Sequence, residues 1–193
     1  MEEFYQRRLP HWHPEDADVF VTWRLYDSYP RQQRILVGPT AGQAFVAMDR
    51  ELNRASTGPR WLEDERVARA VAETLQYGAT QLKLYQLHAW VIMPNHVHIL
   101  IHPQTDLPRI TKSIKAYSAR KANEILGRTG EPFWLDESYD HWVRTSEEFT
   151  KIVRYIQGNP VVAGLVNNPE DWRWSSAFEL AGREACPTKD THA

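Results

Sequence analysis

The chain has 193 residues, 42% of them hydrophobic, and a formal net charge of −2, which together indicate one folded domain and not a disordered chain. Its single cysteine, Cys186, excludes an intrachain disulfide and a cysteine-rich zinc site. No apolar run approaches the roughly 20 residues of a membrane helix, and the first residues lack the apolar segment of a signal peptide. We therefore expect a soluble, cytoplasmic protein.

Patterns typical of one strand and two helices occupy the first 80 residues. Residues 18–27 are rich in β-branched and aromatic side chains and predict a strand. Residues 39–55 predict an amphipathic helix with Thr40 as a candidate N-cap. Residues 61–78 predict a second amphipathic helix, which we expect Gly78 to end.

A β-hairpin is predicted in the middle of the chain. Residues 81–93 and 96–103 are apolar strand patterns separated by Pro94 and Asn95, a pair typical of turns. Helices are predicted at 107–127 and at 146–160, where Gly158-Asn159-Pro160 is the expected stop, with a short strand within 133–145 between them. A last short helix or turn precedes residues 181–193, which we expect to form a flexible tail.

The order of these elements predicts an α+β fold, because strands and helices mix and two of the strands follow each other directly. We expect a ferredoxin-like architecture: a mainly antiparallel sheet with helices packed on one face, plus a C-terminal helical extension. Residues 1–180 then form a single domain.

Two histidines begin the second strand of the hairpin, in the sequence MPNHVHILIHP at residues 93–103. Side chains alternate along a strand, so His96 and His98 share a face and lie about 6.5–7 Å apart, close enough to bind one ion. His102 shares that face but lies about 13 Å from His98, too far to join them. Two histidines are too few for a structural zinc site, whereas an incomplete ligand shell suits a catalytic ion that binds phosphate. The alternative is a pair of strand histidines without a ligand.

The helix predicted at 107–127 combines cations with a tyrosine. Its candidates for contacts with a DNA backbone are Arg109, Lys112, Lys115, Arg120 and Lys121. A solvated helix face is the alternative for these cations. Tyr117 falls at the edge of the apolar stripe, where it either packs against the core or presents a phenol that attacks a phosphodiester.

Several segments of the chain resemble one known family. MPNHVHILI and SIKAYSARKANEILG resemble the HUH single-tyrosine transposases. The segments RRLPHWHPEDADVFVTWRLYDS, FWLDESYDHWVR, IVRYIQGNPVVAGLV and WRWSSA resemble the REP-associated tyrosine transposase branch of that family. The resemblance covers residues 7–178, and its parts occur in the family order.

The resemblance implies a ferredoxin-like fold and a Mg²⁺ or Mn²⁺ ion held by His96 and His98. It also implies that Tyr117 is the nucleophile, which cleaves single-stranded DNA and forms a 5′-phosphotyrosine intermediate. The implied substrates are repetitive extragenic palindromes, whose single strands fold into hairpins.

One position departs from the pattern of that family. Relatives often place an amide ligand of the metal one helical turn after the nucleophile, where this chain has Lys121. A protonated lysine has no lone pair and cannot be a ligand. We therefore expect Glu124 or Asn123, ahead of Glu137, to complete the ligand shell.

Three functions follow from these observations. The first is a metal-dependent endonuclease and strand transferase that acts on hairpin-forming single-stranded DNA as a monomer or homodimer, in the cytoplasm and associated with the nucleoid. The second is a sequence-specific protein that binds DNA hairpins with lost or impaired catalysis, which the Lys121 departure favours. The third is a metal phosphodiesterase that activates water, with Tyr117 structural.

Overall fold

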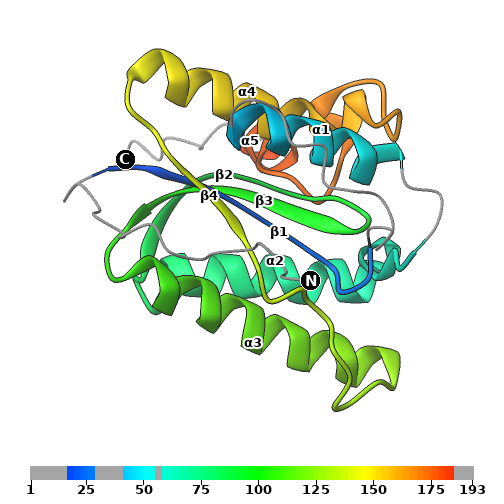
Figure 1. Ribbon diagram of the computed structural model, residues 1–193. Coiled ribbons are helices and arrows are strands. Elements are labelled where there is room, and N and C mark those ends of the chain that lie inside the picture. Colours follow the sequence, from blue (N-terminus) through cyan, green and yellow to red (C-terminus); the bar gives the residue numbers. More distant parts are fainter. Residues whose placement is uncertain (1–16, 29–40, 55–57, 185–193) are drawn as a thin grey trace, which may run out of the picture.

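The computed structural model describes residues 17–28, 41–54 and 58–184 and contains one four-stranded sheet with helices on both faces (Figure 1). The strands are β1 (Val19–Arg24), β2 (Tyr85–Ile92), β3 (His96–Pro103) and β4 (Tyr139–Trp142). The helices are α1 (Ala41–Arg54), α2 (Glu65–Thr80), α3 (Leu107–Leu126), α4 (Ser146–Val162) and α5 (Ser176–Glu184), with short 3₁₀ turns at Trp61–Glu63 and Pro169–Asp171.

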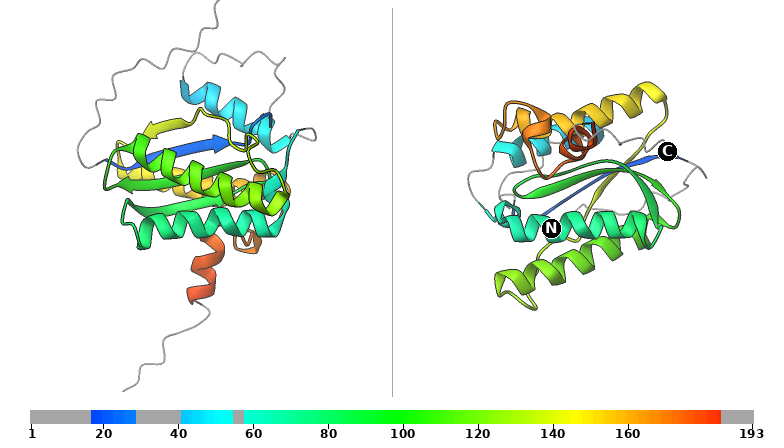
Figure 2. Two further views of the ribbon diagram at one scale, coloured as in Figure 1. Left: turned by 90° about the horizontal axis from the view of Figure 1, so that it is seen from below. Right: turned by 180° about the vertical axis from the view of Figure 1, so that it is seen from behind.

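All pairings in the sheet are antiparallel, in the order β2-β3-β1-β4. The predicted hairpin is confirmed: β2 and β3 pair from Ile92 and Val97 outwards, on either side of the Pro94-Asn95 turn. The α+β fold is likewise confirmed, but the prediction that helices cover one face of the sheet is wrong. Helices α2 and α3 pack on one face and α1 and α4 on the other, whereas α5 starts at the β2 edge of the sheet, next to the bridge between Val91 and Ser175 (Figures 1 and 2).

The two faces of β3 divide its residues as strand alternation requires. Val97, Ile99 and Ile101 are fully buried in the core between the sheet and helices α2 and α3. His96 and His98 point to the opposite face, where Leu100 packs among residues of α1 and α4. The sheet therefore separates the histidine pair from everything carried by α3.

Two predicted helix ends are wrong. Helix α2 continues past Gly78 to Thr80, because this glycine serves close packing: a Cβ at that position would lie 2.6 Å from the Tyr85 hydroxyl. Helix α4 begins after Thr145, whose side chain caps it, and contains Pro160 two residues before its end. The predicted end of α3 at Gly127 is confirmed, where a φ of 67° favours glycine.

The C-terminal helical extension is present as α5, which projects away from the body of the molecule (Figure 2). Helix α5 runs to Glu184. The predicted tail therefore starts too early, because residues 181–184 are still helical. The remainder of that tail, with Cys186, lies outside the described residues, as does the predicted cap Thr40. Among the described residues, no helix combines the length and apolar character needed to cross a membrane.

Candidate functional site

His96 and His98 lie side by side at the start of β3 and are both fully buried. Their ring centroids are 4.7 Å apart and their planes are inclined by 75°. The shared face predicted from strand alternation is therefore confirmed. His102, six residues after His96, instead contacts Asp18 (Nδ1 to Oδ1, 3.2 Å), and so lies outside the pair, as expected.

Each ring of the pair is held through Nδ1. The His96 Nδ1–H donates to Asn95 Oδ1 at 2.6 Å, and the Asn95 amide in turn donates to the Leu52 carbonyl at 3.0 Å. Thr22 Oγ1 lies 2.7 Å from His98 Nδ1. Such bonds fix the orientation of a ligating imidazole and leave the Nε2 lone pair free to bind. Asn95 is thus buried and positions His96, a role beyond the turn.

Asp49 of α1, which no sequence pattern singles out, completes the cluster. Its Oδ1 lies 3.3 Å from His96 Nε2 and 3.1 Å from His98 Nε2, and its side chain is buried. Burial raises the pKa of Asp49, but the proximity of His98 and of His96 outweighs burial and holds the pKa well below its usual range. The carboxylate is therefore ionised at neutral pH.

Two side chains of α4 approach the same carboxylate from the other side. The Tyr155 hydroxyl donates to Asp49 Oδ2, and Asn159 Nδ2 lies 3.3 Å from both that oxygen and His98 Nε2. Residues four apart on a helix lie on one face, which is why both reach the cluster. Burial raises the pKa of Tyr155, and the neighbouring Asp49 charge raises it further.

The cluster fits a divalent cation. Asp49 Oδ1, His96 Nε2 and Asn159 Oδ1 are buried polar atoms that lack a hydrogen-bond partner within the described residues. Because His96 Nδ1 carries the ring hydrogen, its Nε2 lone pair faces the Asp49 carboxylate, an arrangement that a cation between them stabilises. Burial lowers the pKa of His96, which keeps the ring neutral for binding. Carboxylate, imidazole and amide oxygen together suit Mn²⁺ and Mg²⁺.

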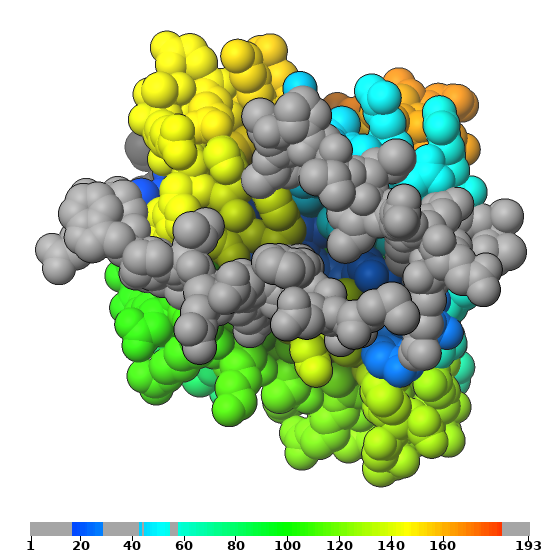
Figure 3. All heavy atoms as spheres, viewed as in Figure 1, coloured from blue at the N-terminus to red at the C-terminus, as the bar shows by residue number. Residues whose placement is uncertain are grey.

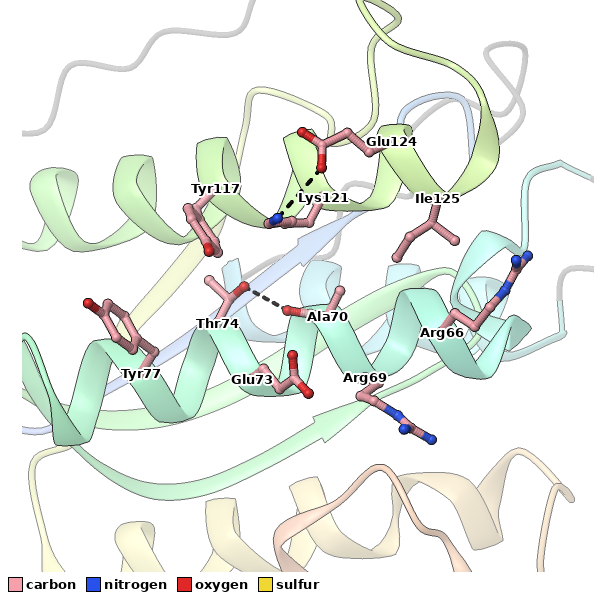
Figure 4. Close-up of a pocket in the computed structure, with 10 residues that line it drawn as sticks. All are labelled: Arg66, Arg69, Ala70, Glu73, Thr74, Tyr77, Tyr117, Lys121, Glu124 and Ile125. Carbon is pink, nitrogen blue, oxygen red and sulfur yellow. Dashed lines mark hydrogen bonds and ion pairs between the residues drawn. The ribbon is translucent and has the colours of Figure 1, made fainter.

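Tyr117 does not join this cluster, so the prediction that its hydroxyl meets the histidines is wrong. It lies on α3, which packs on the opposite face of the sheet, and its side chain is 46% exposed. Two of the expected third ligands, Asn123 and Glu124, lie on the same helix, and Glu137 lies in the loop before β4. Asn123 donates to the Glu131 carbonyl at 2.7 Å, and Glu124 pairs with Lys121 at 3.6 Å (Figure 4). The prediction that Asn123 or Glu124 completes the ligand shell is therefore wrong as well.

The cations of α3 are not equivalent. The Lys115 ammonium donates to the Leu135 carbonyl at 2.6 Å, to the Asp136 carbonyl at 2.7 Å and to Ser138 Oγ at 3.4 Å. These three acceptors match its three donors, so Lys115 holds the loop before β4. The exposed cations of α3 are Arg109, Lys112 and Arg120. Helix α3 forms the lower front surface of the molecule (Figure 3).

Comparison with known proteins agrees with this fold. The chain is 25% identical over 104 residues to the REP-associated tyrosine transposase of Escherichia coli (strain K12), an alignment covering 53% of this chain and 61% of that relative. A solved structure of a REP-associated tyrosine transposase bound to a REP hairpin superposes with a TM-score of 0.58 at 17% identity, covering 94% of this chain and 89% of the other.

The model of the IS200-like transposase family matches residues 59–159, which is more than half of the chain. This segment contains His96, His98, Tyr155 and Asn159, and thus four of the five residues of the cluster. The chain belongs to the IS200-like transposase family.

Proposed function

We propose that this protein nicks and rejoins single-stranded, hairpin-forming DNA, with Tyr155 as the nucleophile and His96, His98 and Asp49 as metal ligands. The observation that carries the proposal is the hydrogen bond from the Tyr155 hydroxyl to a carboxylate that also contacts both histidines. A REP hairpin is the DNA bound by the structurally similar transposase, which supports a hairpin as the substrate.

The chemistry follows from the position of the hydroxyl. Tyr155 is only partly buried, so a phosphate can reach it, while its hydrogen is directed at Asp49 Oδ2. Attack of the phenol oxygen on a phosphodiester breaks the bond to the 3′ oxygen, frees a 3′-hydroxyl and leaves the 5′ phosphate on Tyr155. The phosphotyrosine conserves the bond energy, so attack by a 3′-hydroxyl restores a continuous strand.

A metal ion beside the Tyr155 hydroxyl would favour its ionisation. Burial and Asp49 both disfavour the phenolate, and a divalent cation would offset them and polarise the phosphate. We propose Mg²⁺ or Mn²⁺, held by Asp49, His96 and His98. Asn159 becomes a fourth ligand if its amide turns by 180°, which brings Oδ1 to the place that Nδ2 occupies beside Asp49 and His98. The amide that relatives place one turn after the nucleophile is then Asn159, four residues after Tyr155.

The rival hypothesis of a hairpin-binding protein with lost catalysis depended on Lys121, and with Tyr155 as the nucleophile that departure no longer applies. The test is to incubate the protein with Mn²⁺ and a labelled hairpin oligonucleotide that has an unpaired flank. We expect an adduct that survives denaturation, is lost in Tyr155→Phe and still forms in Tyr117→Phe.

Each other outcome of this test selects a different function. An adduct lost only in Tyr117→Phe would restore the nucleophile expected from the sequence. Binding without cleavage would favour the hairpin-binding protein, and cleavage without an adduct would favour the phosphodiesterase that activates water.

A further inference from the structure

A groove of about 460 Å³ runs between α2 and α3, on the face of the sheet opposite to Asp49 and the histidines (Figure 4). It is open to solvent, and the proposed nicking chemistry does not use it. The residues that line it are Arg66, Arg69, Ala70, Glu73, Thr74 and Tyr77 of α2 and Tyr117, Lys121, Glu124 and Ile125 of α3.

Two exposed tyrosines lie at one end of this groove. Tyr117 projects from α3 towards α2, and Tyr77 rises from α2 at the same end (Figure 4). Their side chains are 46% and 53% exposed, among the largest hydrophobic side chains exposed in the described residues. The Arg120 guanidinium lies 5.2 Å from the centroid of the Tyr117 ring, a distance at which a cation interacts with an aromatic face. Exposed aromatic rings beside cations suit stacking with another planar group.

The groove has more cations than acids. Arg66, Arg69 and Lys121 line it, against Glu73 and Glu124. Two of these cations have carboxylate partners: Arg66 pairs with Asp64 at 2.7 Å and Lys121 with Glu124 at 3.6 Å. Beyond the groove, α3 carries four more cations and no acid, in a chain whose net charge is −2. Positive charge is therefore concentrated on this side of an otherwise slightly acidic protein, which favours a polyanion as the ligand.

We propose that the groove between α2 and α3 binds an unpaired stretch of DNA, whose bases stack on Tyr77 and Tyr117 and whose phosphates contact Arg66, Arg69 and Lys121. Surfaces that bind single strands combine stacking rings with a cationic path for the backbone in this way. A duplex cannot supply the stacking, because its base faces are already occupied. The inference rests on the proposed function and adds a second contact with the substrate, across the sheet from Tyr155.

The test measures binding without chemistry. Two labelled DNAs are titrated in EDTA by fluorescence anisotropy, a hairpin with an unpaired tail and a blunt two-strand duplex with the sequence of its stem, which has neither tail nor loop. We expect Tyr77→Ala and Tyr117→Ala each to weaken binding of the tailed hairpin about tenfold, within the range of one base stacked on one ring. Binding of the blunt duplex stays at the wild-type value. Tyr77→Phe and Tyr117→Phe keep the rings and retain the affinity for the tailed hairpin.

Three outcomes would overturn the inference: unchanged affinity of both alanine variants for the tailed hairpin, equal losses on both DNAs, or phenylalanine variants as weak as alanine. Dimer formation through the groove would also overturn it. In that case the mass measured by sedimentation would double as the protein concentration rises, Tyr77→Ala would return it to the mass of one chain, and the affinities for DNA would be unchanged. Because the titration contains no metal, its result does not depend on whether Tyr155 forms an adduct.

Discussion

Asp49 and Tyr155 are 106 positions apart in the sequence and share a hydrogen bond through Asp49 Oδ2. The other oxygen of the same carboxylate faces the Nε2 atoms of His96 and His98. One side chain thus connects the proposed nucleophile to the proposed metal ligands. Changes at Asp49 should therefore alter metal binding and adduct formation together.

Removing the charge of Asp49 should abolish the response of the protein to metal. Wild-type protein should gain about 5–10 °C in Tm at a Mn²⁺ concentration about 100 times Kd, because the ion binds only the folded chain. Asp49→Asn should lose that gain and should form no adduct. The measurement is thermal unfolding with Mn²⁺ and with EDTA.

A matched control for Asp49→Asn is available in Asp18, which also lies between two histidines. Asp18 Oδ1 is 3.0 Å from His88 Nε2 and 3.2 Å from His102 Nδ1. These three side chains do not converge closely enough to be a metal group, since Asp49, His96 and His98 form the one such group among the described residues. Asp18→Asn should keep the full gain in Tm, and an equal loss in both variants would contradict the assignment.

The histidine pair could be predicted from sequence because strand alternation is a fixed period. A strand that starts at residue 96 must place His96 and His98 on one face, whatever surrounds it. Asp49 was harder to predict, because nothing local connects it to residues 47 positions later. Its one signal is its place on the buried side of α1, between Phe45 and Leu52, where a carboxylate requires a partner.

The choice of tyrosine could not be made from periodicity. An amphipathic stripe shows that a helix buries one side but not which face of the sheet it covers, and α3 and α4 cover opposite faces. Tyr117 was therefore as plausible as Tyr155. The sequence did hold one discriminating signal: four residues after Tyr155 comes an amide, Asn159, whereas four residues after Tyr117 comes Lys121.

The stability of the metal-free protein should depend on pH through His96. Burial lowers the pKa of this ring, while the unfolded chain titrates near its usual value of about 6.5. Between the two values the unfolded state binds more protons, so the free energy of unfolding rises with pH and levels off above about pH 7. This one group contributes at most about 1.4 kcal/mol per pH unit.

The measurement of this pH dependence is urea unfolding in EDTA between pH 5 and pH 8. His96→Gln removes the titrating group and should flatten the slope between pH 5 and pH 7. A slope that is the same in wild type and variant would assign the pH dependence to other residues.

Gly78 should resist substitution although it lies inside a helix. A Cβ there would lie 2.6 Å from the Tyr85 hydroxyl and 3.0 Å from Cζ, and that hydroxyl donates to the Leu75 carbonyl at 2.8 Å. We expect Gly78→Ala to lower the free energy of unfolding by about 1–3 kcal/mol, the cost of overpacking. Gly158→Ala is the control, since its Cβ meets nothing within 4 Å, and should stabilise by about 0.5–1 kcal/mol. Urea unfolding of both variants tests the pair, and a stabilised Gly78→Ala would contradict the packing argument.

Lys112 and Lys115 lie one turn apart on α3 and should respond to different measurements. Lys112 is exposed, so Lys112→Gln should weaken DNA binding and reduce the slope of log K against log salt by about 0.7–0.9 if it contacts one phosphate. Lys115 bonds to two carbonyls and Ser138, so Lys115→Gln should leave that slope unchanged and destabilise the fold by about 1–3 kcal/mol. Titrations at several salt concentrations together with urea unfolding separate the two roles. If Lys115→Gln instead reduced the slope of log K against log salt and kept the stability, Lys115 would contact the DNA backbone, as predicted from the sequence.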